Sequence, residues 1–336
     1  MYQVITIWNL SKPNGEITDT IQNIRLRGYN RETFLPGEYA FKLKKREIRS
    51  LSVSNIADRY CPTRRDLYIE KGINRPRIER HKTWGRIAGT IADRYVSSLL
   101  TEITYERGKN TYSDIRDEIS KFHDNFLNKN CKIISDLELS ESHSFGVEAG
   151  DTDWFLKLLS YNGRIELSMK LLHSILQIEN NLDINHIQVN RIHIRPKTGQ
   201  IGISSPVSPD FIIPDFGIVG DIKTGKKFRD HFLLTCAGYA LAYENEKGEG
   251  NDINWGIIYF FPSYAKSKYV KFITFAQIYI FPIDDHLRHW FITIRNEAYR
   301  IISSETIPAF PPETERDDCK YCKYFHFCQQ QGLEVK

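Results

Sequence analysis

Apolar positions in the first part of the chain recur at helical spacing in three stretches. The first begins near Ser54, a residue type that caps helix N-termini. The same repeat predicts helices over residues 84–106 and 112–128. Residues 1–50 mix short apolar stretches with proline and glycine and end in a basic run, and no function is assigned to them from this pattern.

The second part of the chain alternates strand-like and helical patterns. Its predicted strands are short, rich in β-branched and aromatic residues, and bounded by turn-forming residues. Strands are predicted over residues 133–139, 186–195, 200–204, 210–213, 217–223, 255–261 and 270–280. Helices are predicted over residues 154–182, 229–244 and 284–303. This order predicts a mixed α/β core.

These patterns divide the chain into four segments without internal repeats or low-complexity sequence. An N-terminal extension covers residues 1–50, and a helical region with a basic patch covers residues 51–145. The α/β core covers residues 146–304, and a C-terminal segment with three cysteines covers residues 305–336. At 336 residues, 41% of them hydrophobic, the chain can bury one large domain with appendages or two closely packed domains.

The positive charge is unevenly distributed. The formal net charge is +4, yet residues 59–94 alone contain ten Lys or Arg against four acids. A solvated helix face is the commoner cause of such a run, and a polyanion such as DNA is the alternative partner. On the second interpretation Arg64, Arg65 and Arg86 are expected to contact phosphates, and binding should weaken steeply with salt.

The sequence shows neither a secretory signal peptide nor a membrane span. The first residues lack a basic n-region and a small-residue cleavage site. No apolar run reaches the roughly 18 residues that a span requires. We therefore expect a cytoplasmic protein. Six cysteines in a chain of this size also argue against a disulfide scaffold and favour metal binding by clustered thiols.

Two carboxylates and a lysine form the most informative motif. Asp221 and Lys223 lie two apart on a β-branched run, so their side chains share one face of a strand. A hairpin would bring Asp210, at the end of the preceding strand, beside Asp221. Such a pair suits Mg²⁺ or Mn²⁺, with the Ile222 carbonyl completing the ligand set. The alternative is a pair of exposed hairpin acids with a surface lysine.

Lys223 has a clear use beside such a metal. It can position or deprotonate the attacking water and offset the charge that builds on a phosphate. Downstream, His231, Thr235 and Tyr239 lie on one face of the predicted helix. Tyr239 is expected either to hydrogen-bond a phosphate or hold Lys223, or to be an ordinary tyrosine at the core edge.

The last cysteines have the spacing of a metal site. Cys319, Cys322 and Cys328 form a C-x₂-C-x₅-C pattern. Their fourth ligand is either His326, which would make a zinc site, or a distant cysteine, for which Cys61 before a proline is the best candidate. The remaining two, Cys131 and Cys236, are predicted to be ordinary buried thiols.

Five features follow one another along the chain: the early cysteine, Pro209-Asp210, Asp221-Ile222-Lys223, the helix that contains Tyr239 and ends at Glu244, and the three late cysteines. In this order they resemble the RecB-like PD-(D/E)xK nucleases that carry an iron–sulfur cluster. The similarity is greatest to the CRISPR-associated exonucleases of the adaptation module, in their archaeal type I-A variant. It implies a restriction-endonuclease-like core, a mixed sheet flanked by helices, with an N-terminal helical region. It also implies a 4Fe–4S cluster that staples the C-terminus through the cysteines at positions 61, 319, 322 and 328.

The resemblance further implies Mn²⁺- or Mg²⁺-dependent cleavage of single-stranded DNA or DNA ends, typically from the 5′ end, during CRISPR spacer acquisition. Other adaptation proteins are expected partners. The chain departs from the family pattern at two positions. Gly89 stands where the family has a metal-binding histidine, with Asp93 one turn on as its substitute, and Thr235 replaces the glutamine of Q-x-x-x-Y. These departures raise a second hypothesis, a DNA-end-binding scaffold with weakened catalysis. A third is a zinc-stapled adaptor in transcription or repair.

Overall fold

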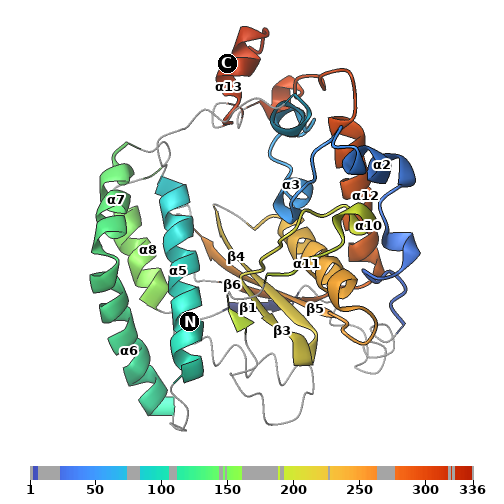
Figure 1. Ribbon diagram of the computed structural model, residues 1–336. Helices are drawn as coiled ribbons and strands as arrows, with labels where there is room; N and C mark the ends of the chain where they lie inside the picture. Colours follow the sequence, from blue (N-terminus) through green and yellow to red (C-terminus); the bar gives the residue numbers. More distant parts are fainter. Residues whose placement is uncertain are drawn as a thin grey trace.

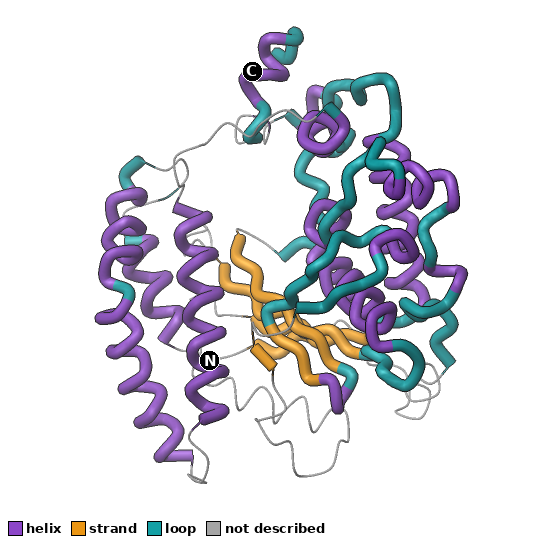
Figure 2. The backbone as a smooth tube through the Cα atoms, in the orientation of Figure 1, coloured by secondary structure: helices purple, strands orange, loops and turns teal. Residues whose placement is uncertain are grey.

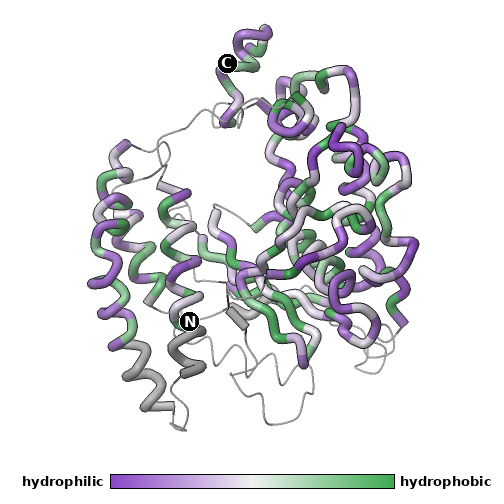
Figure 3. The backbone as a smooth tube through the Cα atoms, viewed as in Figure 1, coloured by the Kyte–Doolittle hydropathy of each residue, from purple (hydrophilic) through white to green (hydrophobic). Residues whose placement is uncertain are grey.

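A six-stranded mixed sheet lies between two layers of helices in the computed structural model (Figures 1 and 2). The structure describes residues 3–6, 23–73, 84–105, 112–143, 147, 150–160, 188–189, 193–225, 228–262, 277–316, 319 and 322–334. The mixed α/β class expected from the sequence is confirmed. Hydrophobic positions gather in the strands, whereas the peripheral loops are mostly hydrophilic (Figure 3).

The sheet has the strand order β1-β6-β5-β4-β3-β2. Its strands are β1 (Gln3–Thr6), β2 (Gln188–Val189), β3 (Phe211–Ile213), β4 (Ile218–Gly225), β5 (Trp255–Pro262) and β6 (Gln277–Pro282). β4 pairs in parallel with β5 and antiparallel with β3. β5 and β6 are antiparallel, and β1 joins β6 in parallel. The central strand β5 is buried over nearly its whole length, as expected for a strand covered on both faces, whereas β4 is buried over its first four residues and half-buried over its last four.

One face of the sheet is covered by four helices. They are α5 (Trp84–Tyr105), α6 (Tyr112–Lys129), α7 (Cys131–Glu141) and α8 (Asp151–Ser160) (Figure 1). Buried side chains of α5 recur at helical spacing, among them Ile87, Ile91 and Tyr95. They share a core cluster with sheet residues that include Ile218 and Ile257. This packing sets α5 directly against the strand that carries Asp221.

The opposite face is covered by α11 (His231–Lys247), α12 (Asp285–Ile302) and α3 (Val53–Ala57). α11 is buried on almost every side because it lies between the sheet and the other two helices. At Gly238 the helices approach so closely that a Cβ would lie 2.6 Å from Phe291 and 2.7 Å from Val53. The remaining short helices are η1 (Arg31–Thr33), α2 (Gly37–Lys44), α4 (Arg65–Leu67), η2 (Tyr68–Gly72), α10 (Thr198–Ile201), η5 (Pro214–Phe216), η6 (Glu313–Glu315) and α13 (Phe325–Gln330).

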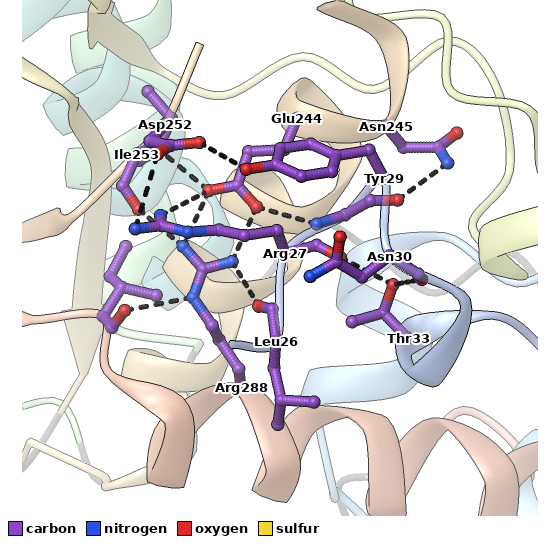
Figure 4. A network of polar contacts seen from close by, with 12 residues as sticks. Leu26, Arg27, Tyr29, Asn30, Thr33, Glu244, Asn245, Asp252, Ile253 and Arg288 are labelled. Atoms are coloured by element: carbon purple, nitrogen blue, oxygen red, sulfur yellow. Dashed lines mark hydrogen bonds and ion pairs between the residues drawn. The ribbon is translucent and has the colours of Figure 1, made fainter. Parts of the chain in front are cut away.

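A buried ionic network joins the N-terminal segment to α11 and α12 (Figure 4). Glu244 accepts hydrogen bonds from Arg27 at 3.0 Å and from both terminal nitrogens of Arg288 at 2.7 and 2.8 Å. The backbone amides of Gly28 and Ile253 donate to the same carboxylate. Together with β1, these contacts tie the described residues of the N-terminal segment to the sheet and to the two helices.

Several predicted elements differ from the structure. The strand predicted over 133–139 is wrong, since these residues belong to α7, whose Ile134 and Leu137 lie one turn apart and are buried beside α5. The strand predicted over 200–204 is also wrong. There α10 ends at Gly202 in a left-handed conformation, and the buried Ile203 follows it without a strand. In both cases the apolar residues are buried in a core, but their backbone does not pair with a neighbouring strand.

Helix boundaries also shift. α3 is capped by Ser52 rather than Ser54, in a reciprocal capping box with Asn55. Of the helix predicted over 154–182, the structure describes only the part within α8, and of the strand predicted over 186–195 it shows β2 and a bridge at Ile194. The remaining parts of these two predictions lie largely outside the described residues. No helix in the described part of the chain is both long and apolar enough to span a membrane.

Candidate functional site

The β3–β4 hairpin brings two acidic residues together. Phe211 faces Gly220 across the antiparallel pair, so the residues just outside that position, Asp210 and Asp221, come opposite each other. The backbone amide of Ile222 donates to Asp210 Oδ2 at 2.6 Å. Gly220 permits this register because a Cβ there would lie 1.9 Å from the Phe211 ring. The structure therefore brings Asp210 and Asp221 side by side on the β3–β4 hairpin.

Lys223 completes a charged triad on the same face of β4. Its Nζ lies 2.6 Å from Asp221 Oδ2. Burial is the largest single effect and disfavours charge on this amine, but Asp221, together with Asp58 and Asp210, raises the pKa of Lys223 above its usual value. Lys223 is therefore an ammonium cation in this arrangement, suited to offset negative charge rather than to accept a proton.

The carboxylates of the site are crowded and largely withdrawn from water. Burial, followed by the charge of Asp221, raises the pKa of Asp210 well above its usual value, and Asp93 adds to the effect. Burial also raises the pKa of Asp93, again with a contribution from Asp221. Asp93 projects from α5, so its carboxylate enters the same electrostatic environment from the opposite helical layer. Like charges that repel at close range favour either a proton or a bound cation.

The donor set fits a hard divalent cation. Asp221 is 2% exposed, and its Oδ2 has no hydrogen-bond partner among the described residues apart from the ion pair with Lys223. Carboxylate oxygens with free lone pairs are the ligands that Mg²⁺ and Mn²⁺ prefer. As the described side chains stand, however, no three His, Cys, Asp or Glu residues are grouped so that they could hold a metal ion. The side-chain ligands brought together by the hairpin are thus two, Asp210 and Asp221.

Helix α11 supplies the polar wall of the site. Burial, followed by the charges of Asp221 and Asp210, raises the pKa of Tyr239 well above its usual value, so the phenol is neutral and able to donate a hydrogen bond. One turn earlier, the hydroxyl of Thr235 is buried and has no hydrogen-bond partner within the described part of the chain. Both side chains therefore offer polar groups that the described protein atoms leave largely unused.

Sequence reasoning missed one member of the site, Asp58. It follows α3, and its Oδ1 lies 3.9 Å from Nε2 of His231 at the start of α11. It also interacts electrostatically with Lys223 and Asp221. Asp58 belongs to no motif and no periodic pattern, so only the packing of α3 against α11 could reveal it.

The four cysteines expected to bind a metal line one pocket. Cys61 comes from the turn before α4, and Cys319, Cys322 and Cys328 come from the C-terminal segment. None of the six cysteines forms a disulfide. His326, the alternative fourth ligand, is exposed and hydrogen-bonds Gln329, and it does not line this pocket. The pocket therefore contains a four-cysteine donor set.

The thiols of this pocket are partly withdrawn from solvent. Burial raises the pKa of Cys322 to about 12, and it also raises the pKa of Cys328. A buried thiol of this kind loses its proton readily only when a metal replaces it. The donor set fits a thiolate-bound metal centre, although the thiols as they stand are not grouped closely enough to hold an ion. Cys236 is buried as predicted, but the prediction for Cys131 is wrong, because it opens α7 on the exposed side.

The structure places two of the three residues predicted to contact DNA inside the protein. Arg64 is 1% exposed, and its guanidinium donates to the backbone carbonyls of Asn55 and Ile56 at the end of α3. Arg65 is also buried. Its guanidinium stacks over Phe310 and donates to Pro308 and Gln331, far away in sequence. In this structure both guanidinium groups bind protein atoms and are buried away from solvent.

Arg86 differs from the other two because its side chain is exposed on α5, and its contact with DNA stays a prediction. Residues 74–83, which hold four more basic residues of the predicted patch, lie outside the described part of the structure.

Comparison with known proteins points to one group of nucleases. A curated protein named CRISPR-associated exonuclease Csa1, from Saccharolobus solfataricus, is 31% identical over 117 residues. That match covers 35% of this chain and 37% of the relative, so it spans little more than a third of either protein. No solved structure matches the chain. Residues 193–331, which contain Asp210, Asp221, Lys223, Tyr239 and the three late cysteines, match the family described as CRISPR-associated exonuclease Csa1.

Proposed function

We propose that this protein is a metal-dependent DNA exonuclease of CRISPR spacer acquisition, with a PD-(D/E)xK active site at the β3–β4 hairpin. One observation carries the proposal. A buried carboxylate from Asp221, a half-buried one from Asp210 and the ammonium group of Lys223 meet on one face of the hairpin. The match of residues 193–331 to a family of CRISPR-associated exonucleases supports the substrate class and the biological setting.

The proposed roles follow from the contacts. Asp210 and Asp221 would hold Mn²⁺ or Mg²⁺ with the Ile222 carbonyl, and Asp93 would add negative charge from α5. A divalent cation bound there supplies a Lewis acid for the phosphodiester and lowers the pKa of a bound water. Lys223, already protonated, would stabilise the charge that develops on the phosphate. Tyr239 would donate a hydrogen bond that positions the strand.

The cysteine pocket has a structural role in this proposal. Cys61, Cys319, Cys322 and Cys328 would hold a 4Fe–4S cluster and tie the C-terminal segment to the region around α4. A zinc ion is the alternative occupant of the same thiols. Iron and acid-labile sulfide analysis of anaerobically purified protein distinguishes the two, since a zinc site contains neither.

The second candidate function is a DNA-end-binding scaffold with little turnover. Gly89 is the specific observation in its favour. A Cβ at this position would lie 3.1 Å from the Thr224 hydroxyl, so a side chain where the resembled family carries a metal-binding histidine would make a tight contact with β4. A site that must use Asp93 instead would bind its metal differently, and binding without cleavage would then be expected.

A cleavage assay decides between the two functions. Single-stranded and duplex DNA, labelled at either the 5′ or the 3′ end, would be incubated with Mn²⁺ or Mg²⁺. The exonuclease proposal expects stepwise, metal-dependent shortening that Asp221→Asn abolishes. Asp215→Asn, an exposed acid in the turn of the same hairpin, is the matched control and should cleave normally. Full activity in Asp221→Asn would refute the proposal, and DNA binding without any shortening would establish the scaffold.

A further inference from the structure

A basic cleft lies on the N-terminal segment, away from the carboxylate site. It is formed by α2, the residues that follow it, Lys71 of η2 and the start of α10. α2 and α10 lie side by side in the layer opposite α5 (Figure 1). The cleft is open to solvent and encloses about 1020 Å³, and no residue of the carboxylate site lines it.

The charged residues that line this cleft are all cationic. They are Lys44, Arg46, Arg49 and Lys71, and no acidic residue lines the cleft among those that the structure describes. Lys71 pairs with Glu70 at 3.6 Å, whereas the other three are exposed. The lining therefore has the charge that a row of phosphates would neutralise.

An exposed aromatic ring lies in the same lining. Phe41 is 55% exposed, unusual for a large apolar side chain, and the ammonium of Lys45 lies 4.7 Å from its ring centre. Grooves that bind single-stranded nucleic acid combine cations that follow the backbone with aromatic rings on which bases stack. A duplex, whose bases are already stacked, cannot use such a ring.

The backbone at Arg46 gives an independent indication. α2 ends in a Schellman motif, in which Glu47 N donates to Lys42 O and Arg46 N donates to Leu43 O, both at 3.0 Å. Arg46 occupies the left-handed position of this motif with φ of 61°. Glycine is strongly preferred there because it adopts positive φ without steric cost. Arg46 lines the cationic cleft although its left-handed backbone conformation is unfavourable for a residue with a side chain. This conformational cost indicates that the charge of Arg46 has a use.

We propose that this cleft binds single-stranded DNA, with the phosphates along Lys44, Arg46 and Arg49 and a base stacked on Phe41. The proposal rests on the proposed function, because it gives the substrate strand a binding surface outside the cleavage site. It also assigns a role to the basic run at residues 42–49, to which the sequence pattern assigned none. In this proposal the cleft takes over the phosphate-binding role that the sequence assigned to Arg64 and Arg65, whose guanidinium groups are buried.

Salt dependence of binding provides the main test. Fluorescence anisotropy with a labelled 20-nucleotide oligothymidylate, without divalent cations, would be measured between 50 and 300 mM salt. The triple substitution of Lys44, Arg46 and Arg49 by alanine should lower the salt slope by about 2, since each lost phosphate contact on a single strand contributes about 0.7. The matched control removes three exposed lysines of the α6–α7 region, Lys121, Lys129 and Lys132, and should change the slope little. Equal slopes for the two triple variants would overturn the proposal.

Two single substitutions separate DNA binding from folding. Arg46→Gly should leave the Tm unchanged or raise it, because glycine suits the left-handed position, and yet weaken oligothymidylate binding several-fold. Phe41→Ala should weaken binding of the single strand more than binding of a duplex of the same length. Unchanged affinity in both variants would contradict the proposal even if the triple variant failed to fold.

The same measurements keep this inference apart from the nuclease proposal. Asp221→Asn leaves the cleft intact and should bind oligothymidylate with the salt slope of the unaltered protein. Normal cleavage by Asp221→Asn would defeat the nuclease proposal without affecting the cleft. Loss of cleavage in Asp221→Asn, combined with unaltered DNA binding in the cleft variants, would support the nuclease proposal and contradict the cleft proposal.

Discussion

The ammonium of Lys223 lies 2.6 Å from Asp221 Oδ2, two residues away on the same strand face. The pair joins a cation to a carboxylate that is 2% exposed and has no other hydrogen-bond partner among the described residues. The lysine keeps its proton in this pair, because the nearby carboxylates raise its pKa above the usual value. The role of each group in catalysis can therefore be tested separately.

Replacing Lys223 by alanine should lower the single-turnover cleavage rate about 10²- to 10³-fold, the usual loss when one charge-stabilising donor is removed. Binding of Mn²⁺ should not weaken, because the substitution removes a cation from beside the carboxylates. Single-turnover cleavage and Mn²⁺ titration measure the two effects. Lys197→Ala, at an exposed lysine, is the control. Weaker Mn²⁺ binding in the Lys223 variant would assign the lysine to building the site rather than to the reaction.

The Glu244 network should be a main determinant of stability. Glu244→Ala would leave the buried cations of Arg27 and Arg288 without their shared carboxylate. Breaking a buried ion pair from one side costs about 3–5 kcal/mol, so the free energy of unfolding should fall by that amount. Denaturant unfolding measures it, with Glu249→Ala on the exposed loop after α11 as the control. A loss below about 1 kcal/mol, as for a surface pair, would contradict the prediction.

The thiols should differ in reactivity when no metal is bound. Burial raises the pKa of Cys322 to about 12, so at pH 8 this thiol is protonated and a poor nucleophile. Cys131 is exposed at the start of α7 and is predicted to be alkylated first. Iodoacetamide labelling followed by peptide mass analysis gives the order. Raising the pH towards 12 should bring Cys322 into reaction, and early modification of Cys322 at pH 8 would show that the pocket is open.

Arg65 should hold the cysteine pocket closed. Its guanidinium joins the pocket to Pro308 and Gln331 and stacks 4.2 Å from the ring centre of Phe310. Arg65→Ala should therefore increase the alkylation rate of Cys328 at least several-fold and speed the loss of the proposed metal centre to a chelator. Arg31→Ala removes an exposed arginine that does not line the pocket and should have neither effect. Equal metal retention in the two variants would assign the pocket's closure to other contacts.

The candidate site was largely readable from the sequence because its parts are local. A period of two places Asp221 and Lys223 on one strand face, and a short turn returns the chain to Asp210. The strand over 133–139 was misassigned because Ile134 and Leu137 fit either an edge strand or a helix face. The helix forms because both side chains then pack in one buried cluster with α5.

The sequence by itself determined the α/β class, the β3–β4 hairpin with its acids and lysine, and the spacing of the late cysteines. Only the tertiary structure decided that Arg64 and Arg65 are internal, that Asp58 joins the carboxylate site and that Cys61 shares a pocket with Cys328. The physical reason is distance along the chain. Turn chemistry and side-chain periodicity act over a few residues, whereas burial and charge environment depend on segments such as 308–331 that fold back from more than 240 residues away.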